Sequence, residues 1–186
     1  MTQASNIPAA EDPLNALRRT MSRSAAEIAV APIHEVRDLM LHELERAEDT
    51  EIQTTAALRR FAEATDNLRL QRLLHQRVQE GERVSSDIRA ALEEYSSSHR
   101  YVHNRAATVL ISQTDRLLQL ARTPQVTDLI IVSGVQKLQL YCLSSWGTLR
   151  LLAKILGDKE MAVHIKGAIE EGSRWDRQLA ELAPTL

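Results

Sequence analysis

Residues 124–157 read PQVTDLIIVSGVQKLQLYCLSSWGTLRLLAKILG and decide the class of fold. Drawn as a helix, this run is apolar on nearly every side, which is the pattern of a helix packed against several neighbours. Lys137, Arg150 and several Gln and Ser residues interrupt it, and burying them in lipid would be unfavourable. Pro124 suits a first helical turn and Gly157 a helix end. We therefore expect a central helix buried in a protein core.

The whole chain has the composition of a helical protein. It contains six glycines, five prolines and 3% aromatic residues, and long stretches show helical spacing without strand-like alternation. Four long helices with a shorter crossover helix between the second and third predict an all-α, ferritin-like four-helix bundle over residues 31–186. The other helices are expected from Pro32 to about Ala64, from a cap at Asp66 or Asn67 to the serines at 96–98, from Arg105 to Arg122, and from a cap at Asp158 to just before Pro184.

Length, charge and cysteine content narrow the classes of function. A chain of 186 residues with 44% hydrophobic residues fits one domain with a real core. The formal net charge of -2 supplies no general reason to bind nucleic acid or an anionic membrane. Cys142 is the single cysteine and cannot form an internal disulfide, so a reducing cytoplasm is the simpler expectation. No nucleophile–base set or phosphate-binding glycine loop is recognisable.

Residues 1–30 are expected to be an N-terminal extension, either a tail or a short helix. They lack the continuous apolar stretch of a secretory signal, and Glu11 and Asp12 do not fit a transit peptide. Pro13 could open a short amphipathic segment that carries Leu14, Leu17 and Met21. The same stretch contains three basic residues, Arg18, Arg19 and Arg23. So few basic residues in a tail are usually solvated and bind no partner.

Charged residues lie on the apolar seams of the predicted helices. Glu51 falls on the seam of the first long helix, and Glu80 flanks the seam of the second, which includes Arg77. Buried charges of this kind need partners, and Glu51 and Glu80 could pair with Arg77 or Lys137. The seam of the last helix reads Ile165, Ala168, Gly172, Trp175, Leu179 and Leu182.

Three stretches carry a resemblance to a known family. They are DLMLHEL at 38–44 with Glu51-Ile52-Gln53 after it, WGTLRLLAKILG at 146–157, and IEEGSRWDRQLAELA at 169–183. Over Val36 to Ala183 the chain resembles the YciF-like ferritin-like family of bacterial stress-associated proteins. Members of that family resemble di-iron carboxylate bundles, in which one Glu from each of two helices and Glu-x-x-His pairs from the other two surround two metals.

The resemblance implies that most of the metal ligands have been replaced in this chain. Glu51 and Glu80 match glutamates of the family, whereas positions that carry His or Gln in the family are Arg77 and Val84 here. The replacements would remove charge from the interior, as a metal-free core requires. The family pattern Glu-His-Tyr-Glu on the third long helix corresponds to Gln139, Leu140, Tyr141 and Cys142, and a family Glu on the last helix to Gly172, beside Glu171 and Asp176.

Several other residues have a structural interpretation as well as a functional one. Cys142, on a nearly all-apolar helix, is expected to be an inert buried thiol with a raised pKa rather than a nucleophile. His99 and His103 are expected to be solvated linker residues, because nothing completes a metal site around them. Trp146 and Trp175, at seam spacing, are expected in the core.

Three functions are compatible with these observations. The first is a non-catalytic structural or protein-interaction module, a stress-related cytoplasmic homodimer with an unknown protein partner and no cofactor. The second is a divergent oxidase or peroxidase that holds iron or manganese at Glu51, Glu80 and Glu171. The third is a small-ligand carrier that uses the vacated metal space, since Gly172 and Cys142 are smaller than the residues they replace. We expect no enzymatic activity, no nucleic-acid binding and no membrane insertion.

Overall fold

The structure, a computed structural model, describes residues 32–95 and 102–186. Residues Glu35–Leu186 form one compact unit. The predicted N-terminal extension, residues 1–30, lies outside the described residues and stays a prediction. The described part is helical and contains no strand; its elements are α2 (Val36–Ala64), α3 (Leu68–Tyr95), α4 (Arg105–Leu120), α5 (Pro124–Ile155), α6 (Lys159–Leu182) and a short 3-10 helix (Ala183–Thr185).

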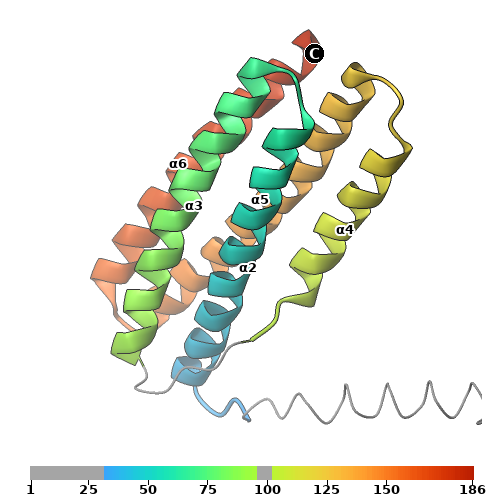
Figure 1. Cartoon of the computed structure of the whole chain (residues 1–186). Coiled ribbons are helices and arrows are strands. Elements are labelled where there is room, and N and C mark those ends of the chain that lie inside the picture. Colours follow the sequence, from blue (N-terminus) through green and yellow to red (C-terminus); the bar gives the residue numbers. More distant parts are fainter. Residues whose placement is uncertain (1–31, 96–101) are drawn as a thin grey trace, which may run out of the picture. The chain divides into compact units, whose positions relative to one another are not determined.

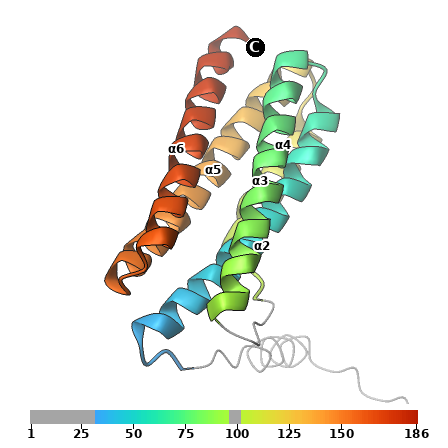
Figure 2. The same cartoon turned by 90° about the vertical axis from the view of Figure 1, so that its left-hand side faces the viewer.

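The four long helices form a bundle, and α4 is the crossover that connects its two halves (Figures 1 and 2). α2 packs against α3 and α5, and α6 packs against α5 and α3. Because α4 runs back along the bundle between the end of α3 and the start of α5, α3 and α5 point in the same direction. This is the all-α, ferritin-like layout with a crossover helix that the sequence predicts.

The helix ends follow the predicted caps closely. Each of the caps Asn67 and Asp158 accepts a hydrogen bond from the backbone N–H three residues later. The bond from Leu70 N is 3.2 Å long, and the bond from Met161 N is 3.0 Å long. Gly157 has φ 77°, and its N–H together with that of Asp158 closes the last turn of α5 on the carbonyls of Lys154 and Ala153. This tight reversal joins α5 directly to α6.

Two predicted ends were wrong by a few residues. α2 begins at Val36 rather than near Pro32, because the N–H of Glu35 bonds to the Asp38 carboxylate at 3.0 Å and makes Glu35 the cap. α4 ends at Leu120 rather than Arg122, since Ala121 is already extended ahead of Pro124.

The crossover helix is anchored through its cap residue, Asn104. The Asn104 N–H donates to Asp49 Oδ2 at 2.6 Å, and its side-chain amide donates to Thr50 Oγ1 at 2.7 Å and Tyr141 Oη at 2.9 Å. Asn104 is buried, so these bonds are largely protected from water. They attach the start of α4 to both α2 and α5.

The core consists of two apolar clusters with polar residues between them. One cluster gathers around Phe61, Leu74 and Trp175, and the other around Met40, Leu92 and Trp146. Both tryptophans are therefore core residues, as predicted. The residues that lie between the clusters along the helices include Glu51, Arg77 and Gln139, which are buried although polar.

The long helix α5 is buried on one side only. It is the one helix in the described part that could cross a membrane by its length and composition, a test that the core helix of a soluble protein also passes. One side of α5 packs in the core, but Leu140, Leu151 and Ile155 are more than half exposed on the other. The prediction of a buried core helix is therefore right for the inner face of α5. Its outer face is exposed and has no packing partner among the described residues of this chain.

Candidate functional site

The middle of the bundle contains a buried ion pair between Arg77 of α3 and Glu51 of α2. Nη2 of Arg77 donates to both carboxylate oxygens of Glu51, at 2.9 and 3.2 Å, and the two side chains are 1% and 0% exposed. The guanidinium also lies over the ring of Trp146, 5.5 Å from its centroid. Glu51 thus has a cation of the protein itself as its partner.

The same guanidinium extends the network across the bundle to α5 and α6. Nε of Arg77 donates to Oε1 of Gln139 at 2.7 Å, and Nε2 of Gln139 donates to the carbonyl oxygen of Gly172 at 3.2 Å. Arg77, Glu51, Gln139 and Gly172, here called the central cluster, therefore connect all four long helices. Connected, buried polar groups of this kind are stronger than isolated pairs, because water does not compete for them.

Two glycines make the space that the central cluster fills. A Cβ added at Gly81 would lie 2.6 Å from Thr55 Oγ1 and 2.8 Å from Arg77 Nη1. A Cβ added at Gly172 would lie 2.7 Å from Gln139 Nε2 and 2.9 Å from the Trp146 ring. No side chain larger than glycine fits at either position without displacing the network.

Hydrogen bonding in the central cluster is incomplete. Among the described residues, Nη1 of Arg77 and Oγ1 of Thr55 are buried side-chain atoms without a hydrogen-bond partner. Unmade bonds in a dry interior cost roughly 1–3 kcal/mol each. The cluster is therefore not the most stable filling of this space. Well-packed apolar side chains of similar volume would stabilise the fold at least as much.

Burial and the Glu51 charge control the ionisation of this region. Burial alone would lower the pKa of the Arg77 guanidinium, but the adjacent Glu51 carboxylate outweighs it, and the pKa is raised above its ordinary value. Burial, with Glu51 nearby, raises the pKa of the Cys142 thiol to about 12. Cys142 is fully buried next to Thr54, so it is the inert thiol that the sequence predicts.

A di-iron centre does not fit the residues of the central cluster. Glu51 already has a guanidinium on both of its oxygens, and the facing groups are an amide and a protonated thiol, which are poor partners for iron. No group of three or more His, Cys, Asp or Glu residues that could hold a metal ion occurs in residues 32–95 and 102–186. A bound metal would have to displace the Arg77 side chain.

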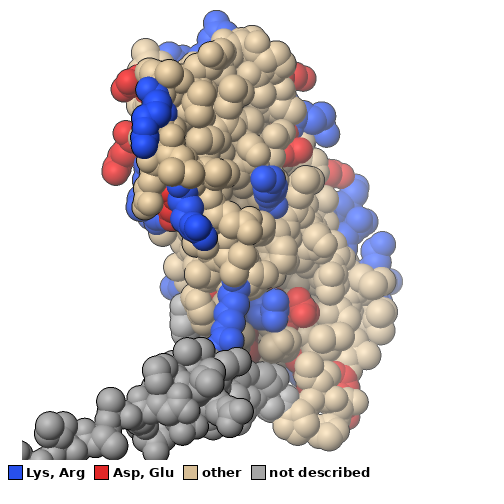
Figure 3. Space-filling model, turned by 90° about the vertical axis from the view of Figure 1, so that its right-hand side faces the viewer, with Lys and Arg blue, Asp and Glu red and all other residues tan. Residues whose placement is uncertain are grey.

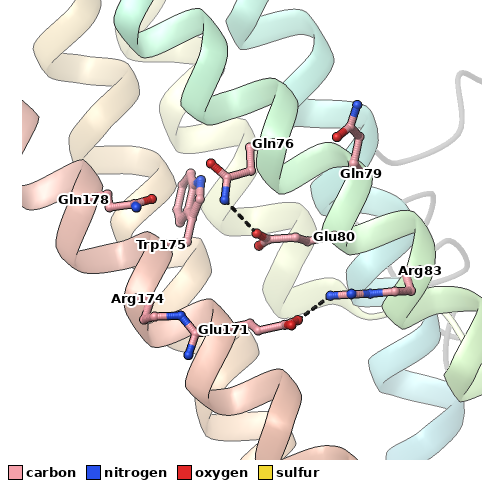
Figure 4. A pocket seen from close by; sticks show the side chains of 8 residues that line it. All are labelled: Gln76, Gln79, Glu80, Arg83, Glu171, Arg174, Trp175 and Gln178. Atoms are coloured by element: carbon pink, nitrogen blue, oxygen red, sulfur yellow. Dashed lines mark hydrogen bonds and ion pairs between the residues drawn. The ribbon is translucent and has the colours of Figure 1, made fainter.

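The other two candidate ligands, Glu80 and Glu171, lie at an opening on the outside between α3 and α6 (Figure 4). Glu80 accepts a hydrogen bond from Gln76 at 3.0 Å, and Glu171 forms an ion pair with Arg83. The opening has a volume of about 360 Å³, and Glu51 is not among the residues that line it. The structure therefore brings Glu80 and Glu171 to one opening and leaves Glu51 in the interior.

The positions identified as replaced ligands do not all face the interior. Val84, Gln139, Cys142 and Gly172 are buried, as the loss of interior ligands requires. Leu140 is 57% exposed on the outer side of α5, so its prediction as an interior position was wrong. Tyr141 and Cys142 are its neighbours in sequence, but a helix turns through about 100° per residue, which places adjacent side chains on different faces.

The space next to Gly172 is filled rather than vacant. Besides Gln139 and Trp146, Leu143 comes within 3.2 Å of the place a Cβ would take. The expectation that Gly172 and Cys142 leave room for a small ligand was therefore wrong at Gly172, because larger neighbours occupy the volume that the missing side chain releases.

The histidine prediction is tested at one of its two residues. His103 is half exposed, and its ring contacts Thr108 Oγ1 at 3.0 Å and Asp49 Oδ2 at 3.6 Å. It is thus a linker residue, although one with partners. His99 lies outside the described residues.

Reasoning from the sequence missed the participation of Thr55, Gly81 and the Trp146 ring. One signal was available for Gly81. It follows Arg77 by four positions on the same seam, so a glycine there leaves space beside a long buried side chain.

Comparisons with known proteins agree with the fold and the sequence pattern. The family model described as a domain of unknown function, DUF892, matches residues 35–186. Protein YciF of Escherichia coli strain K12 is 28% identical over 149 residues, which are 80% of this chain and 90% of that protein.

Two solved structures have the same fold. The crystal structure of the E. coli stress protein YciF matches with a TM-score of 0.76 at 28% identity, covering 81% of this chain and 96% of that one. YcfI of Rhodopseudomonas palustris, whose description proposes a structural role, matches with a TM-score of 0.76 at 23% identity and the same coverage. The family model alone spans most of the chain, and the chain therefore belongs to the DUF892 family, the family of YciF.

Proposed function

We propose that this protein is a non-catalytic helical bundle of the bacterial cytoplasm that acts as a structural or protein-interaction module in a stress response. The observation that carries the proposal is the central cluster, in which Arg77 occupies both oxygens of Glu51. The descriptions of two relatives, one as a stress protein and one with a proposed structural role, point in the same direction.

The central cluster supports the loss of a di-iron site through its charges. In a di-iron bundle the metal charge offsets several interior carboxylates. In this chain one guanidinium offsets one carboxylate, and Gln139 supplies a neutral amide. The central cluster is thus electrically balanced without a metal, and the proposed cofactor is none.

Metal analysis after exposure to ferrous iron tests this proposal. The protein is purified without chelator, incubated with ferrous iron anaerobically and desalted. We expect no retained iron, and the Glu51→Ala variant should give the same result as the wild type. About two metal ions per chain, lost in Glu51→Ala, would establish the di-metal oxidase alternative instead.

We also propose that the protein is a homodimer that buries the outer side of α5. This side presents large apolar residues separated by small ones, which lets a second helix approach closely. Figure 3 faces the side of the molecule on which α4 lies in Figure 1 and shows uncharged surface with Lys, Arg, Asp and Glu side chains scattered over it. The exposed residues of the outer α5 side include Leu129, Ser133, Lys137, Leu140, Ser144, Gly147, Leu151, Lys154 and Ile155.

Sedimentation equilibrium tests the dimer. The Leu140→Glu and Leu151→Glu substitutions together should give a monomer, because two charges would enter the interface. The matched control is Val163→Glu with Leu68→Glu, since both residues are exposed on other helices and should leave the dimer intact. A wild-type protein that sediments as a monomer at micromolar concentration would refute this proposal.

A further inference from the structure

A second opening, separate from the central cluster, lies at the end of the bundle where α3 ends and α6 begins. It is a groove of about 290 Å³ between α3 and α6, with α2 and α5 contributing to its floor. In Figure 2 the two helices diverge toward this end of the bundle. Its apolar lining includes Val84, Ile88, Trp146, Leu149, Ile165 and Ala168.

The rim of this groove is acidic. Among residues 32–95 and 102–186 no Lys or Arg side chain lines it, and the one basic side chain of that lining is His164, which contacts Asp87 at 3.0 Å. The protein as a whole is nearly neutral, with a net charge of -2, so this gathering of carboxylates is local. The acidic residues on the rim are Asp87, Glu94, Asp158 and Glu160.

An apolar groove with acidic edges fits a basic amphipathic helix. Such a helix places apolar residues every three or four positions into the groove and its Lys or Arg side chains against the rim. On α3 the lining runs from Val84 to Glu94, which is about 15 Å of helix. Two to three turns of a partner helix would fill this length.

Residues 13–24, PLNALRRTMSRS, have this pattern and lie outside the helices of the bundle. Leu14, Leu17 and Met21 have the spacing of one helical face, and Pro13 suits a first turn. The segment carries three arginines, Arg18, Arg19 and Arg23, and no carboxylate. It lies outside the described residues.

The tether between this segment and the bundle is long enough. Arg37, in the first turn of α2, donates to the carbonyl oxygen of Tyr95 at 3.1 Å, and the Tyr95 hydroxyl donates to Asp158 on the rim at 3.2 Å. The first turn of α2 is therefore connected to the rim of the groove through Arg37 and Tyr95. The eleven residue-to-residue steps from 24 to 35 can span up to about 35 Å.

From the charge complementarity, the matching length and the tether, we infer that the groove binds the basic amphipathic segment of residues 13–24. The three apolar side chains enter the groove, and the arginines face the carboxylates of the rim. This inference does not depend on the absence of a metal from the central cluster.

Binding of a labelled peptide to the full-length protein tests the inference. The probe is a synthetic peptide of residues 13–26 with a fluorescent group at its C-terminus, and binding is followed by anisotropy at low salt. The host chain carries Arg18→Glu, Arg19→Glu and Arg23→Glu, so that its own segment no longer competes. We expect this host to bind the peptide at least tenfold more tightly than the wild-type chain, in which the tethered segment has a high effective concentration.

Charge reversal at the rim locates the binding site. Adding Glu94→Lys and Glu160→Lys to the host should weaken peptide binding roughly tenfold or more. The matched control is Glu63→Lys with Glu181→Lys, two exposed glutamates on α2 and α6 away from the groove, which should change binding less than about twofold. Circular dichroism checks that all hosts remain helical. A peptide with Leu17→Asp should not bind, because a charge would enter the apolar groove.

Four results would each overturn the inference. These are no peptide binding to the host with the three glutamates, equal binding to the host and the wild-type chain, equal binding to the rim variant and its control, and undiminished binding of the Leu17→Asp peptide.

Discussion

Two of the ion pairs that connect α3 to its neighbours differ in their exposure to water. Arg77 pairs with Glu51 of α2 in the interior, where both side chains are at most 1% exposed. Arg83, six positions later, pairs with Glu171 of α6 at the outer opening, where the side chains are 56% and 38% exposed. The residue types are similar, but water screens only the second pair, so removing one partner of the first pair should cost more stability than removing one partner of the second.

The largest expected effect is that of removing one partner of the interior pair. Glu51→Ala leaves the Arg77 guanidinium buried without its counter-charge, which should lower the free energy of unfolding by about 3–5 kcal/mol. Arg77→Met should have a similar effect, because it leaves the Glu51 carboxylate buried without its counter-charge. Urea denaturation followed by circular dichroism measures both.

The double variant Glu51→Leu with Arg77→Met is the control, because it removes both charges. It should be within about 1–2 kcal/mol of the wild type or more stable. A single variant that loses less than about 1 kcal/mol would mean that water reaches the interior pair as it does the outer one.

The next effect concerns the glycine beside the interior pair. Gly81→Ala places a Cβ 2.6 Å from Thr55 Oγ1 and 2.8 Å from Arg77 Nη1, so it should destabilise the protein by about 1–3 kcal/mol. Gly167→Ala, at an exposed position of α6, has no atom within 4 Å of its Cβ and should stabilise the helix by about 0.5–1 kcal/mol. Opposite signs in thermal denaturation would sharpen the comparison, whereas two stabilising substitutions would contradict the tight packing at Gly81.

The pH dependence of stability reports on burial next to the interior pair. The pKa of Cys142 is about 12 in the folded protein against 9.0 for the ordinary thiol. Between these values the unfolded chain loses the thiol proton and the folded chain keeps it, so stability is full below pH 9 and falls as the pH rises. At pH 10 the loss should be about 1 kcal/mol relative to pH 8.

Cys142→Ala provides the reference for this measurement, since other groups also titrate above pH 9. The difference in unfolding free energy between wild type and Cys142→Ala should shrink or change sign as the pH rises from 8 to 10. A difference that stays constant over that range would show that Cys142 is accessible to water.

The smallest expected effect is at the outer pair. Arg83→Ala removes the partner of Glu171 at the opening and should cost no more than about 1 kcal/mol. The effect should diminish further in 0.5 M salt, because exposed charges are screened. If Arg83→Ala lowered the free energy of unfolding as much as Glu51→Ala, the two ion pairs would not differ in their contribution to stability.

The helices and their order could be predicted from the chain because local rules decide them. Gly157 and the cap at Asp158 mark the turn between α5 and α6, and Thr123-Pro124 separates α4 from α5, as predicted. Errors occurred where the rule is weak, as at Pro32, since a proline that suits a first turn does not by itself begin a helix.

The central cluster could be predicted only in part. The seam positions of Glu51 and Arg77 were recognised from their spacing, but Lys137 was an equal candidate partner until the structure placed it on the exposed side of α5. Leu140 was misplaced because a run of four family positions does not lie on one helical face. Spacing gives the face of a residue relative to its own helix and not relative to the neighbouring ones.

The sequence by itself determined an all-helical bundle, its crossover helix and the burial of Cys142, because these depend on composition and on contacts within a few residues. Only the tertiary structure decided that Arg77 takes Glu51 as its partner, that Gln139 completes the link to Gly172, and that Glu80 and Glu171 face an outer opening instead. The physical reason is that a buried charge selects its partner by distance across helices, and those distances are set by packing among all four of them.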